Sequence, residues 1–203
     1  MAVEGSDSRL ADTGRRSSAV AVFRKAGSKR SMLKTSVAPD EEQLPDPRVR
    51  FERLAPGQYA VYRALRLAAL KESPEAFAAT YAEASLRGET RWKDQADALA
   101  QASDRAAFVA YDGSFPVGLM AFYGVEAALG EVMQVWVSPR SRGTGVASDL
   151  LDRLLRWARA QDFVRVQVRA RTSNRRAIRF YEKEGFLRAD ETDGEVRLVR
   201  NLK

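Results

Sequence analysis

The sequence contains neither cysteine nor histidine. Without cysteine, no disulfide can form and no covalent thioester can be held on a cysteine of the protein. Without histidine, the usual side-chain base near neutral pH is missing, and so are Ser-His-Asp triads and histidine-ligated metal sites. Proton transfers must therefore use Asp, Glu, Tyr, Lys or water, and we expect no metal site.

Long apolar runs are missing as well. No stretch approaches the roughly 20 residues that a membrane-spanning helix needs, so we expect no membrane partner and a cytoplasmic protein. With 203 residues, of which 45% are hydrophobic, the chain can hold one domain of usual size plus a tail. The sequence leaves open whether the protein is a monomer or a homodimer.

Acidic residues are absent from one stretch near the N-terminus. None lies between Thr13 and Pro39, whereas seven Arg and Lys residues lie there and equal the whole net charge of +7. We therefore expect the folded remainder to be close to neutral and not to bind nucleic acid. Residues 1–47 are rich in Ser, Gly, Arg and Ala and lack sustained periodicity, which is typical of a disordered tail. The alternative is a basic arm that contacts acidic protein or nucleic acid.

Regular patterns begin at Val49. The spacing of apolar residues predicts the order β-α-α-β-β-β-α-β-α-β-β. This order describes an α/β domain with a mixed, mostly antiparallel twisted sheet of six to seven strands and about four helices. We expect helices at residues 56–71, with Pro56 in the first turn, at 83–102, from about 146, and at 174–184. Strands are expected at 49–54, 106–111, 116–125, 130–137, 164–168, 186–189 and 195–201. Asp112-Gly113 predicts a hairpin, with a loop longer than two residues.

The most informative segment joins the strand at 130–137 to the helix that follows it. It reads Val135-Trp136-Val137-Ser138-Pro139-Arg140-Ser141-Arg142-Gly143-Thr144-Gly145-Val146-Ala147. A helix N-terminus has unpaired N–H groups and a partial positive charge, and glycines let the backbone approach an anion closely. Arg140 and Arg142 add positive charge. The loop is therefore predicted to bind a pyrophosphate without a metal.

Two segments of the chain resemble the signatures of the GNAT acetyltransferases. The first, Arg142-x-x-Gly145-x-Ala147, is similar to the family's [Q/R]-x-x-G-x-[G/A] motif. The second contains Asn174, Ala177, Phe180-Tyr181 and Glu184-Gly185-Phe186 at the spacing of the family's later motif. One helix and one strand separate the two segments, as in the family. The resemblance covers roughly residues 49–202 and indicates a GNAT domain over 48–203 behind the tail over 1–47.

The resemblance implies a function as well as a fold. We expect the chain to bind acetyl-CoA and to pass the acetyl group to a primary amine of a small molecule or protein, by direct attack in a ternary complex. In similar proteins the strand before the loop splays from its neighbour and bonds the pantetheine arm, while the loop amides bind the pyrophosphate. The cofactor-binding residues so implied are Val135, Trp136, Val137, Arg142, Gly143, Thr144, Gly145, Val146, Ala147, Ser148, Asn174 and Tyr181. Tyr181 is also implied to be the general acid that protonates the departing thiolate.

The resemblance does not supply the general base. An ordinary ammonium has a pKa of ~10.4 and must lose a proton before it attacks. Some related enzymes carry a catalytic Glu on the strand before the asparagine motif, but Arg169 holds that place here. Glu131, which opens the strand leading to the loop, is the best substitute, although it could be a mere exposed strand-end carboxylate. Glu126 and a base acting through ordered water are the alternatives.

Two other function classes fit the sequence less well. Gly143-x-Gly145-x-x-Ser148 approximates a dinucleotide-binding fingerprint, but its third glycine is replaced by Ser and five polar residues separate the strand from the glycines. No Gly-Lys-Ser/Thr follows, which excludes a P-loop. The non-enzymatic alternative is a GNAT module that binds acyl-CoA as a sensor or interaction protein, and turnover with any amine would distinguish it from a transferase.

Overall fold

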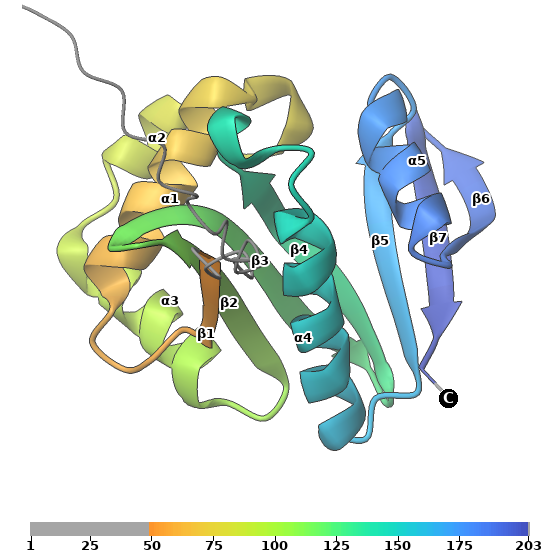
Figure 1. The fold of residues 1–203 in the computed structure, drawn as a ribbon, viewed down its shortest axis with the longest axis horizontal. Coiled ribbons are helices and arrows are strands. Elements are labelled where there is room, and N and C mark those ends of the chain that lie inside the picture. Colours follow the sequence, from red (N-terminus) through yellow and green to blue (C-terminus); the bar gives the residue numbers. More distant parts are fainter. Residues whose placement is uncertain (1–48, 203) are drawn as a thin grey trace, which may run out of the picture. The chain divides into compact units, whose positions relative to one another are not determined.

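The computed structural model describes residues 49–202, which form a seven-stranded mixed sheet with helices on both faces (Figure 1). The strand order is β1-β2-β3-β4-β5-β7-β6, and β4 and β5 are the one parallel pair of this sheet. The strands are β1 (Val49–Arg53), β2 (Arg105–Asp112), β3 (Phe115–Glu126), β4 (Leu129–Val137), β5 (Arg165–Arg171), β6 (Leu187–Thr192) and β7 (Glu195–Asn201). The predicted mixed, mostly antiparallel sheet is confirmed. The tail expected over 1–47 lies outside the described residues.

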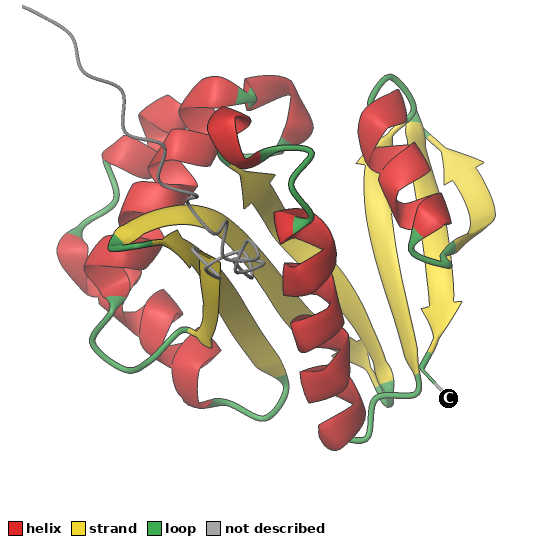
Figure 2. Ribbon diagram, in the orientation of Figure 1, coloured by secondary structure: helices red, strands yellow, loops and turns green. Residues whose placement is uncertain are grey.

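Five α-helices accompany this sheet within residues 49–202. They are α1 (Tyr59–Glu72), α2 (Tyr81–Ser85), α3 (Glu89–Gln101), α4 (Val146–Ala160) and α5 (Arg175–Lys183), with short 3-10 turns at Pro74–Ala76 and Pro139–Ser141. α1 and α3 pack on one face of the sheet, whereas α4 and α5 lie on the other face (Figure 2). None of the helices between residues 49 and 202 is long and apolar enough to cross a membrane.

Two hydrophobic cores hold these layers together. On one face, the leucines of α4 are fully buried against β2, β3 and β4, and the same core continues to α5 and β7. Each buried leucine contributes about 1.5–3 kcal/mol, so this helix is firmly anchored. On the other face, Trp92 of α3 packs edge-to-face on Tyr62 of α1, with ring centroids 5.8 Å apart. The sheet between them is a fixed support for the loops at its ends.

The first helix begins later than expected. α1 starts at Tyr59, not at Pro56, and its first helical hydrogen bond runs from the Tyr62 N–H to the Gln58 carbonyl. Pro56 lies instead in a turn, because Gly57 has φ +80° and the Gln58 side chain accepts from the Ala55 N–H. This turn chemistry outweighs the preference of proline for a helix first turn.

The helix expected over 83–102 is two helices. Thr80 and Glu83 form a capping box that starts α2 at Tyr81. α2 ends at Ser85, and α3 starts afresh after Gly88. The interruption explains why five helices are found where about four were expected.

The hairpin between β2 and β3 has the predicted position but a shorter loop. β2 ends at Asp112 and β3 begins at Phe115, so the loop has only two residues. Gly113 has φ +58°, which a tight two-residue turn requires. The expectation of a longer loop was wrong.

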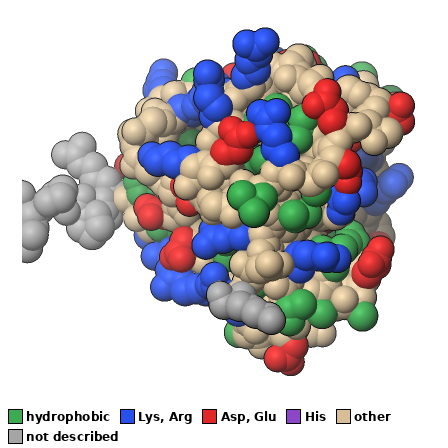
Figure 3. Space-filling view, turned by 90° about the vertical axis from the view of Figure 1, so that its right-hand side faces the viewer, with side chains coloured by type: hydrophobic (Ala, Val, Ile, Leu, Met, Phe, Trp, Pro, Cys, Tyr) green, Lys and Arg blue, Asp and Glu red, His purple; other side chains and the backbone are tan. Residues whose placement is uncertain are grey.

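The charge of the domain also differs from expectation. Basic side chains outnumber acidic ones among residues 49–202. The seven basic residues between Thr13 and Pro39 do not account for the net charge, because acidic residues before Thr13 and after Pro39 offset most of them. On the side of the molecule that carries α5, β6 and β7, Lys and Arg side chains are scattered with acidic ones between them (Figure 3). The folded part of the chain is therefore basic rather than near neutral.

Candidate functional site

Strands β4 and β5 separate shortly after they meet. They pair from Leu129 to Glu131, opposite Arg165 to Gln167, and no pairing continues beyond Glu131 although β4 runs on to Val137. A register shift in the β3–β4 pairing and a left-handed Gln134, with φ +56°, accompany the change of direction. The chain thus has the splay that its resemblance to the GNAT family implies.

The main chain of β4 presents free groups at this splay. The Ser138 N–H donates to the Val117 carbonyl on the β3 side, over 2.8 Å. Successive residues of a strand point their main-chain groups to alternate sides. The N–H groups of Val135 and Val137 therefore face the open side, away from β3. They are available to a ligand that lies between β4 and β5.

The loop after β4 leads into α4, whose N-terminus has no side-chain cap. Gly143 and Gly145 have φ +83° and +90°, and Gly145 is the residue that precedes α4. No side chain caps this helix start, so the N–H groups of its first turn remain free. A Cβ at either glycine would meet nothing within 4 Å. The glycines are therefore required by their left-handed backbone, and the space before them is open.

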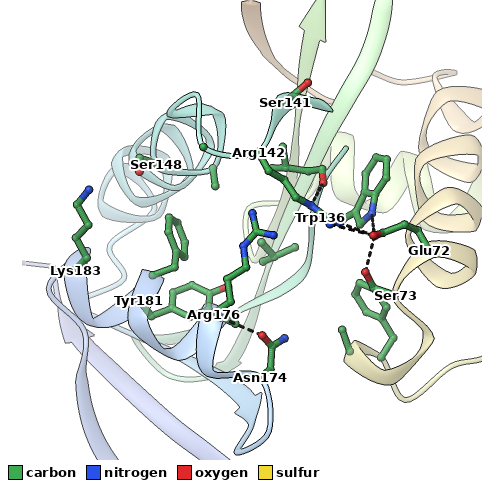
Figure 4. A pocket seen from close by; sticks show the side chains of 18 of the residues that line it. Glu72, Ser73, Trp136, Ser141, Arg142, Ser148, Asn174, Arg176, Tyr181 and Lys183 are labelled. Atoms are coloured by element: carbon green, nitrogen blue, oxygen red, sulfur yellow. Dashed lines mark hydrogen bonds and ion pairs between the residues drawn. The ribbon is translucent and has the colours of Figure 1, made fainter. Parts of the chain in front are cut away.

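The splay and the helix start open into one cavity of about 570 Å³. Its walls come from the end of α1, the end of β4, the loop before α4, the first turn of α4 and one side of α5 (Figure 4). Most residues of the expected cofactor site line it: Val135, Trp136, Val137, Arg142, Gly143, Gly145, Ala147, Ser148, Asn174 and Tyr181. Thr144 and Val146 do not, because the Thr144 hydroxyl donates to the Ser141 carbonyl and Val146 packs in the core.

Arg142 is held by an acidic partner that the sequence did not indicate. Its two terminal nitrogens donate to Glu72, Nη1 to Oε1 over 3.0 Å and Nη2 to Oε2 over 2.5 Å. Its Nε donates to the Val137 carbonyl over 2.9 Å. The Arg142 guanidinium therefore ties the end of α1 to the end of β4, and its charge is already paired rather than free at the mouth of the loop.

Glu72 collects three donors at the rim of the cavity. Besides Arg142, the Trp136 Nε1 donates to its Oε2 over 3.1 Å and the Ser73 hydroxyl donates to the same oxygen over 2.5 Å (Figure 4). Hydrogen bonds from Arg142 are the main reason that the pKa of Glu72 falls to about 2. A carboxylate of so low a pKa is a poor general base, so Glu72 is a structural anion.

Glu72→Gln is expected to weaken the acid sensitivity of folding. A carboxylate whose folded pKa is depressed to about 2, from its ordinary 4.5, adds stability above the ordinary pKa. This stability disappears as the pH falls toward 2. The pair is partly exposed, so about 1 kcal/mol at most is involved. Urea unfolding at about pH 6 and about pH 3 should show the wild type losing more stability than the variant. The control is Glu75→Gln, because Glu75 forms no ion pair within residues 49–202. It should lose as much stability as the wild type. Equal losses in wild type and Glu72→Gln would contradict this account.

Tyr181 is buried at the inner wall of the cavity. It is 3% exposed, and its ring contacts Phe180 and Phe186 edge-to-face, at centroid distances of 5.0 and 5.4 Å. Burial raises the pKa of its phenol, so the hydroxyl stays protonated near neutral pH. Within residues 49–202 this hydroxyl has no hydrogen-bond partner, which leaves it free for a ligand.

Asn174 and the cationic residues of α5 complete the site. The Asn174 side chain accepts from the Ala177 N–H over 3.1 Å and so caps α5. Arg176 and Lys183 both line the cavity, and Figure 4 shows Arg176 reaching from α5 into the space before the Arg142 loop. Ser148 of α4 donates to Glu184 over 2.6 Å and links the two helices across the cavity. Arg176 and Lys183 therefore line the same cavity as the uncapped N-terminus of α4.

Glu131 lies at the fork, the point where β4 and β5 separate, but outside the lining of this cavity. It is only 7% exposed, so the alternative of an exposed strand-end carboxylate was wrong. Its Oε2 accepts from the Gln167 side chain over 2.7 Å. It faces the side of the sheet that carries α1, because its neighbours along β4, Gly130 and Val132, face the α4 side. Glu126, by contrast, is exposed at the end of β3.

Several lining residues were not foreseen as part of the site. Glu72 and Phe77 enter it from the end of α1 and the turn after it, and Phe180 enters from α5. Phe180 stands inside the second motif, next to Tyr181, which is a usable signal. Nothing in the sequence indicates that Glu72 pairs with Arg142, because the two residues lie 70 positions apart.

The open loop amides, the splayed strand and the cationic side chains of α5 lie around one cavity, an arrangement that suits the acyl-CoA of an acyl-CoA-dependent acyltransferase. The model of the acetyltransferase (GNAT) family matches residues 67–186. The chain belongs to this family. A search of curated proteins by sequence returned no match.

Solved structures share this fold. An acetyltransferase of the GNAT family from Streptococcus pneumoniae superposes with a TM-score of 0.64 at 17% identity, over 75% of this chain and 99% of that chain. The GNAT domain of S. lividans PAT gives 0.63 at 20% identity, over 75% and 90%. The PaiA N-acetyltransferase of Thermoplasma acidophilum, solved with coenzyme A, gives 0.62 at 12% identity, over 75% and 98%. At these identities the likeness shows the fold alone.

Proposed function

We propose that the protein transfers the acetyl group of acetyl-CoA to a primary amine of a small molecule or protein, by direct attack within a ternary complex. One observation carries this proposal: the free edge of β4 and the uncapped start of α4 open into the same cavity. An extended cofactor with a diphosphate at one end and a thioester at the other fits both features at once. The absence of cysteine agrees with direct attack, because no cysteine can carry the acetyl group.

The binding roles follow from these groups. The N–H groups from Gly143 to Ser148 would bind the diphosphate, since a helix start favours anions. Arg176 and Lys183 would add positive charge beside it. The main chain from Val135 to Val137 would bond the pantetheine arm, and its open N–H groups could stabilise the developing oxyanion. Asn174 would contact the arm or hold the start of α5.

The chemical step needs two proton transfers. The amine nitrogen forms a bond to the thioester carbon and loses a proton to a base, while the C–S bond breaks and the sulfur gains a proton. Tyr181 would supply the second proton, because its hydroxyl is free at the cavity. Glu131 would accept the first, directly or through water, because its carboxylate lies where β4 and β5 separate, on the face of the sheet that carries α1. Glu126 and solvent are the alternative acceptors.

The test combines binding with turnover. Acetyl-CoA is titrated into the full chain by calorimetry, and free thiol release is then followed over a broad panel of amines. We expect a micromolar-range dissociation constant and turnover with a subset of the panel. If acetyl-CoA binds but no amine is acetylated, the non-catalytic acyl-CoA-binding module is the better explanation. Neither heat nor thermal stabilisation at saturating acetyl-CoA would refute both proposals.

Three further expectations remain proposals of the same kind. These are the domain boundary at residue 48, the cytoplasmic location, and the monomeric or homodimeric state. Gel filtration with light scattering tests the oligomeric state directly.

A further inference from the structure

The face of the sheet that carries α1 and α3 contains a buried arginine without an acidic partner. Arg66 of α1 is 8% exposed. Its Nη1 is buried and makes no hydrogen bond, and none of the acidic side chains of residues 49–202 forms an ion pair with it. The titratable groups that act on it are the neutral phenols of Tyr62 and Tyr123 and a second guanidinium, that of Arg87. Arg66 therefore lies among hydroxyls and positive charge, and none of these groups is a carboxylate.

This arrangement is unfavourable unless something completes it. A buried charge is normally paired, because the interior solvates it poorly. Within residues 49–202 the charge of Arg66 is compensated by the Phe77 ring, whose centroid is 5.0 Å from the Arg66 Cζ. A cation–π contact offsets only part of such a penalty. An unpaired, planar guanidinium offers donors in the fork geometry that a carboxylate accepts.

Polar contacts lead from Tyr62, a neighbour of Arg66 on α1, to the fork of the sheet. One turn before Arg66 on the same face of α1, the Tyr62 hydroxyl donates to the Gln134 Oε1 over 2.8 Å. The Gln134 Nε2 donates to the Tyr123 hydroxyl over 3.0 Å. Gln134 is the left-handed residue of β4 that immediately precedes Val135. The cluster thus begins where the free edge of β4 begins.

Phe77 connects the cluster to the cofactor cavity. Its ring packs on Arg66, and Phe77 is also part of the cavity wall. A ligand that extends from the cavity toward α1 would therefore pass Phe77 before it reaches Arg66. The attacking amine must come to the thioester end of the cavity.

An acidic group lies on the same face, at the other side of the fork. Glu131 of β4 pairs directly with Tyr123 of β3 in the antiparallel ladder, and directly opposed residues of a ladder share a face. Its carboxylate forms no ion pair within residues 49–202; its direct partner is the neutral Gln167 amide, whose oxygen accepts from the Arg197 guanidinium over 3.4 Å. The face therefore presents an anion at the fork and an unpaired cation beneath α1.

We propose that the acceptor amine carries a carboxylate, and that Arg66 binds this carboxylate while the amino group lies at the fork beside Glu131. The acceptors are free amino acids or other small amino-carboxylic acids. The Tyr123 hydroxyl, which accepts from Gln134 and keeps its own proton, contributes a donor to the carboxylate end. This inference rests on the proposed acetyl transfer and specifies its substrate class.

The test compares matched acceptors on the full chain. Thiol release is measured for the twenty amino acids and for their amides, which lack the carboxylate. We expect the acids to be preferred over the amides about tenfold or more in kcat/KM. Arg66→Met keeps an unbranched side chain against Phe77 but removes the charge. It should raise KM for the acids about tenfold, leave kcat within about threefold, and not affect the amides.

Two controls keep the test decisive. Arg63→Met changes an exposed arginine of the same helix and should match the wild type, and Arg66→Lys should recover part of the affinity. As a readout besides turnover, an acetylated amino acid should raise the melting temperature of the wild type but not of Arg66→Met, provided that both bind acetyl-CoA equally. This last comparison also excludes misfolding of the variant.

The outcomes separate this inference from the transfer itself. If acetyl-CoA fails to bind, the proposed function fails first. If acetyl-CoA binds and the amides are acetylated as well as the acids, the carboxylate site is refuted and acetyl transfer stands. The same holds if other amines are acetylated but no acid is acetylated or stabilises the protein. Equal KM values for Arg66→Met and wild type would refute the role of Arg66 in particular.

Discussion

Gly145→Val is expected to weaken acetyl-CoA binding by about a hundredfold or more, which corresponds to roughly 2.8 kcal/mol. Gly145 has φ +90° and ψ −14°, a left-handed conformation that a β-branched residue adopts only with strain of about 1–3 kcal/mol. The backbone would relax by turning the first N–H groups of α4 away from the cavity. The new side chain would also enter the cavity, because Gly145 lines it and no atom stands within 4 Å of an added Cβ.

Gly113→Val is the matched control for this variant. Gly113 has φ +58°, an added Cβ there also meets nothing within 4 Å, and it lies in the β2–β3 hairpin outside the cavity lining. It should therefore lose stability through similar strain but keep the wild-type dissociation constant. Calorimetric titration at a temperature where both variants are folded, as checked by circular dichroism, makes the comparison. A dissociation constant within about threefold of wild type for Gly145→Val would show that the loop amides are not the anion site.

The features that sequence reasoning located correctly are local ones. The glycine loop that leads into α4 and the short helix α5, which follows Asn174 and ends before Gly185, are each determined by a few neighbouring residues. Such short-range rules act before any tertiary contact is formed. The loop at 138–145 could therefore be assigned to the start of a helix, and its place in the family could be recognised, from the sequence alone.

The errors arose where two local preferences compete. Pro56 favours a helix start, but Gly57 and Gln58 form a turn that delays α1 to Tyr59. The apolar spacing over 83–102 favours one helix, but the Thr80 capping box and Gly88 divide it. In both places a specific turn or cap overrides a pattern averaged over many residues, which no periodicity can reveal.

The parts of the site that depend on long-range contacts were beyond sequence reasoning. Arg142 was assigned to the cofactor as a free charge, yet its guanidinium is bound by Glu72. The burial of Glu131 and the missing partner of Arg66 depend on which strands and helices meet. These are consequences of packing between distant segments, and the sequence pattern contains only the residue types.

Tyr181→Phe is expected to lower kcat about a hundredfold while leaving the dissociation constant of acetyl-CoA nearly unchanged. A general acid contributes about 10²–10⁴ to a rate, and the variant removes only the hydroxyl. The ring contacts with Phe180 and Phe186 are kept. Since the hydroxyl has no partner within residues 49–202, the free energy of unfolding should change by no more than about 0.5 kcal/mol.

The raised pKa of Tyr181 does not weaken this expectation. Burial disfavours the phenolate, but a thiolate leaving into the same cavity is destabilised by the same loss of water, so the relative acidity of the two groups is largely preserved. Tyr111→Phe is the control, since Tyr111 is another buried tyrosine, on β2 and outside the cavity lining. Single-turnover measurements at saturating acetyl-CoA isolate the chemical step from product release. If Tyr181→Phe and Tyr111→Phe turn over equally fast, the sulfur must take its proton from the attacking amine or from water, and Tyr181 belongs only to the core.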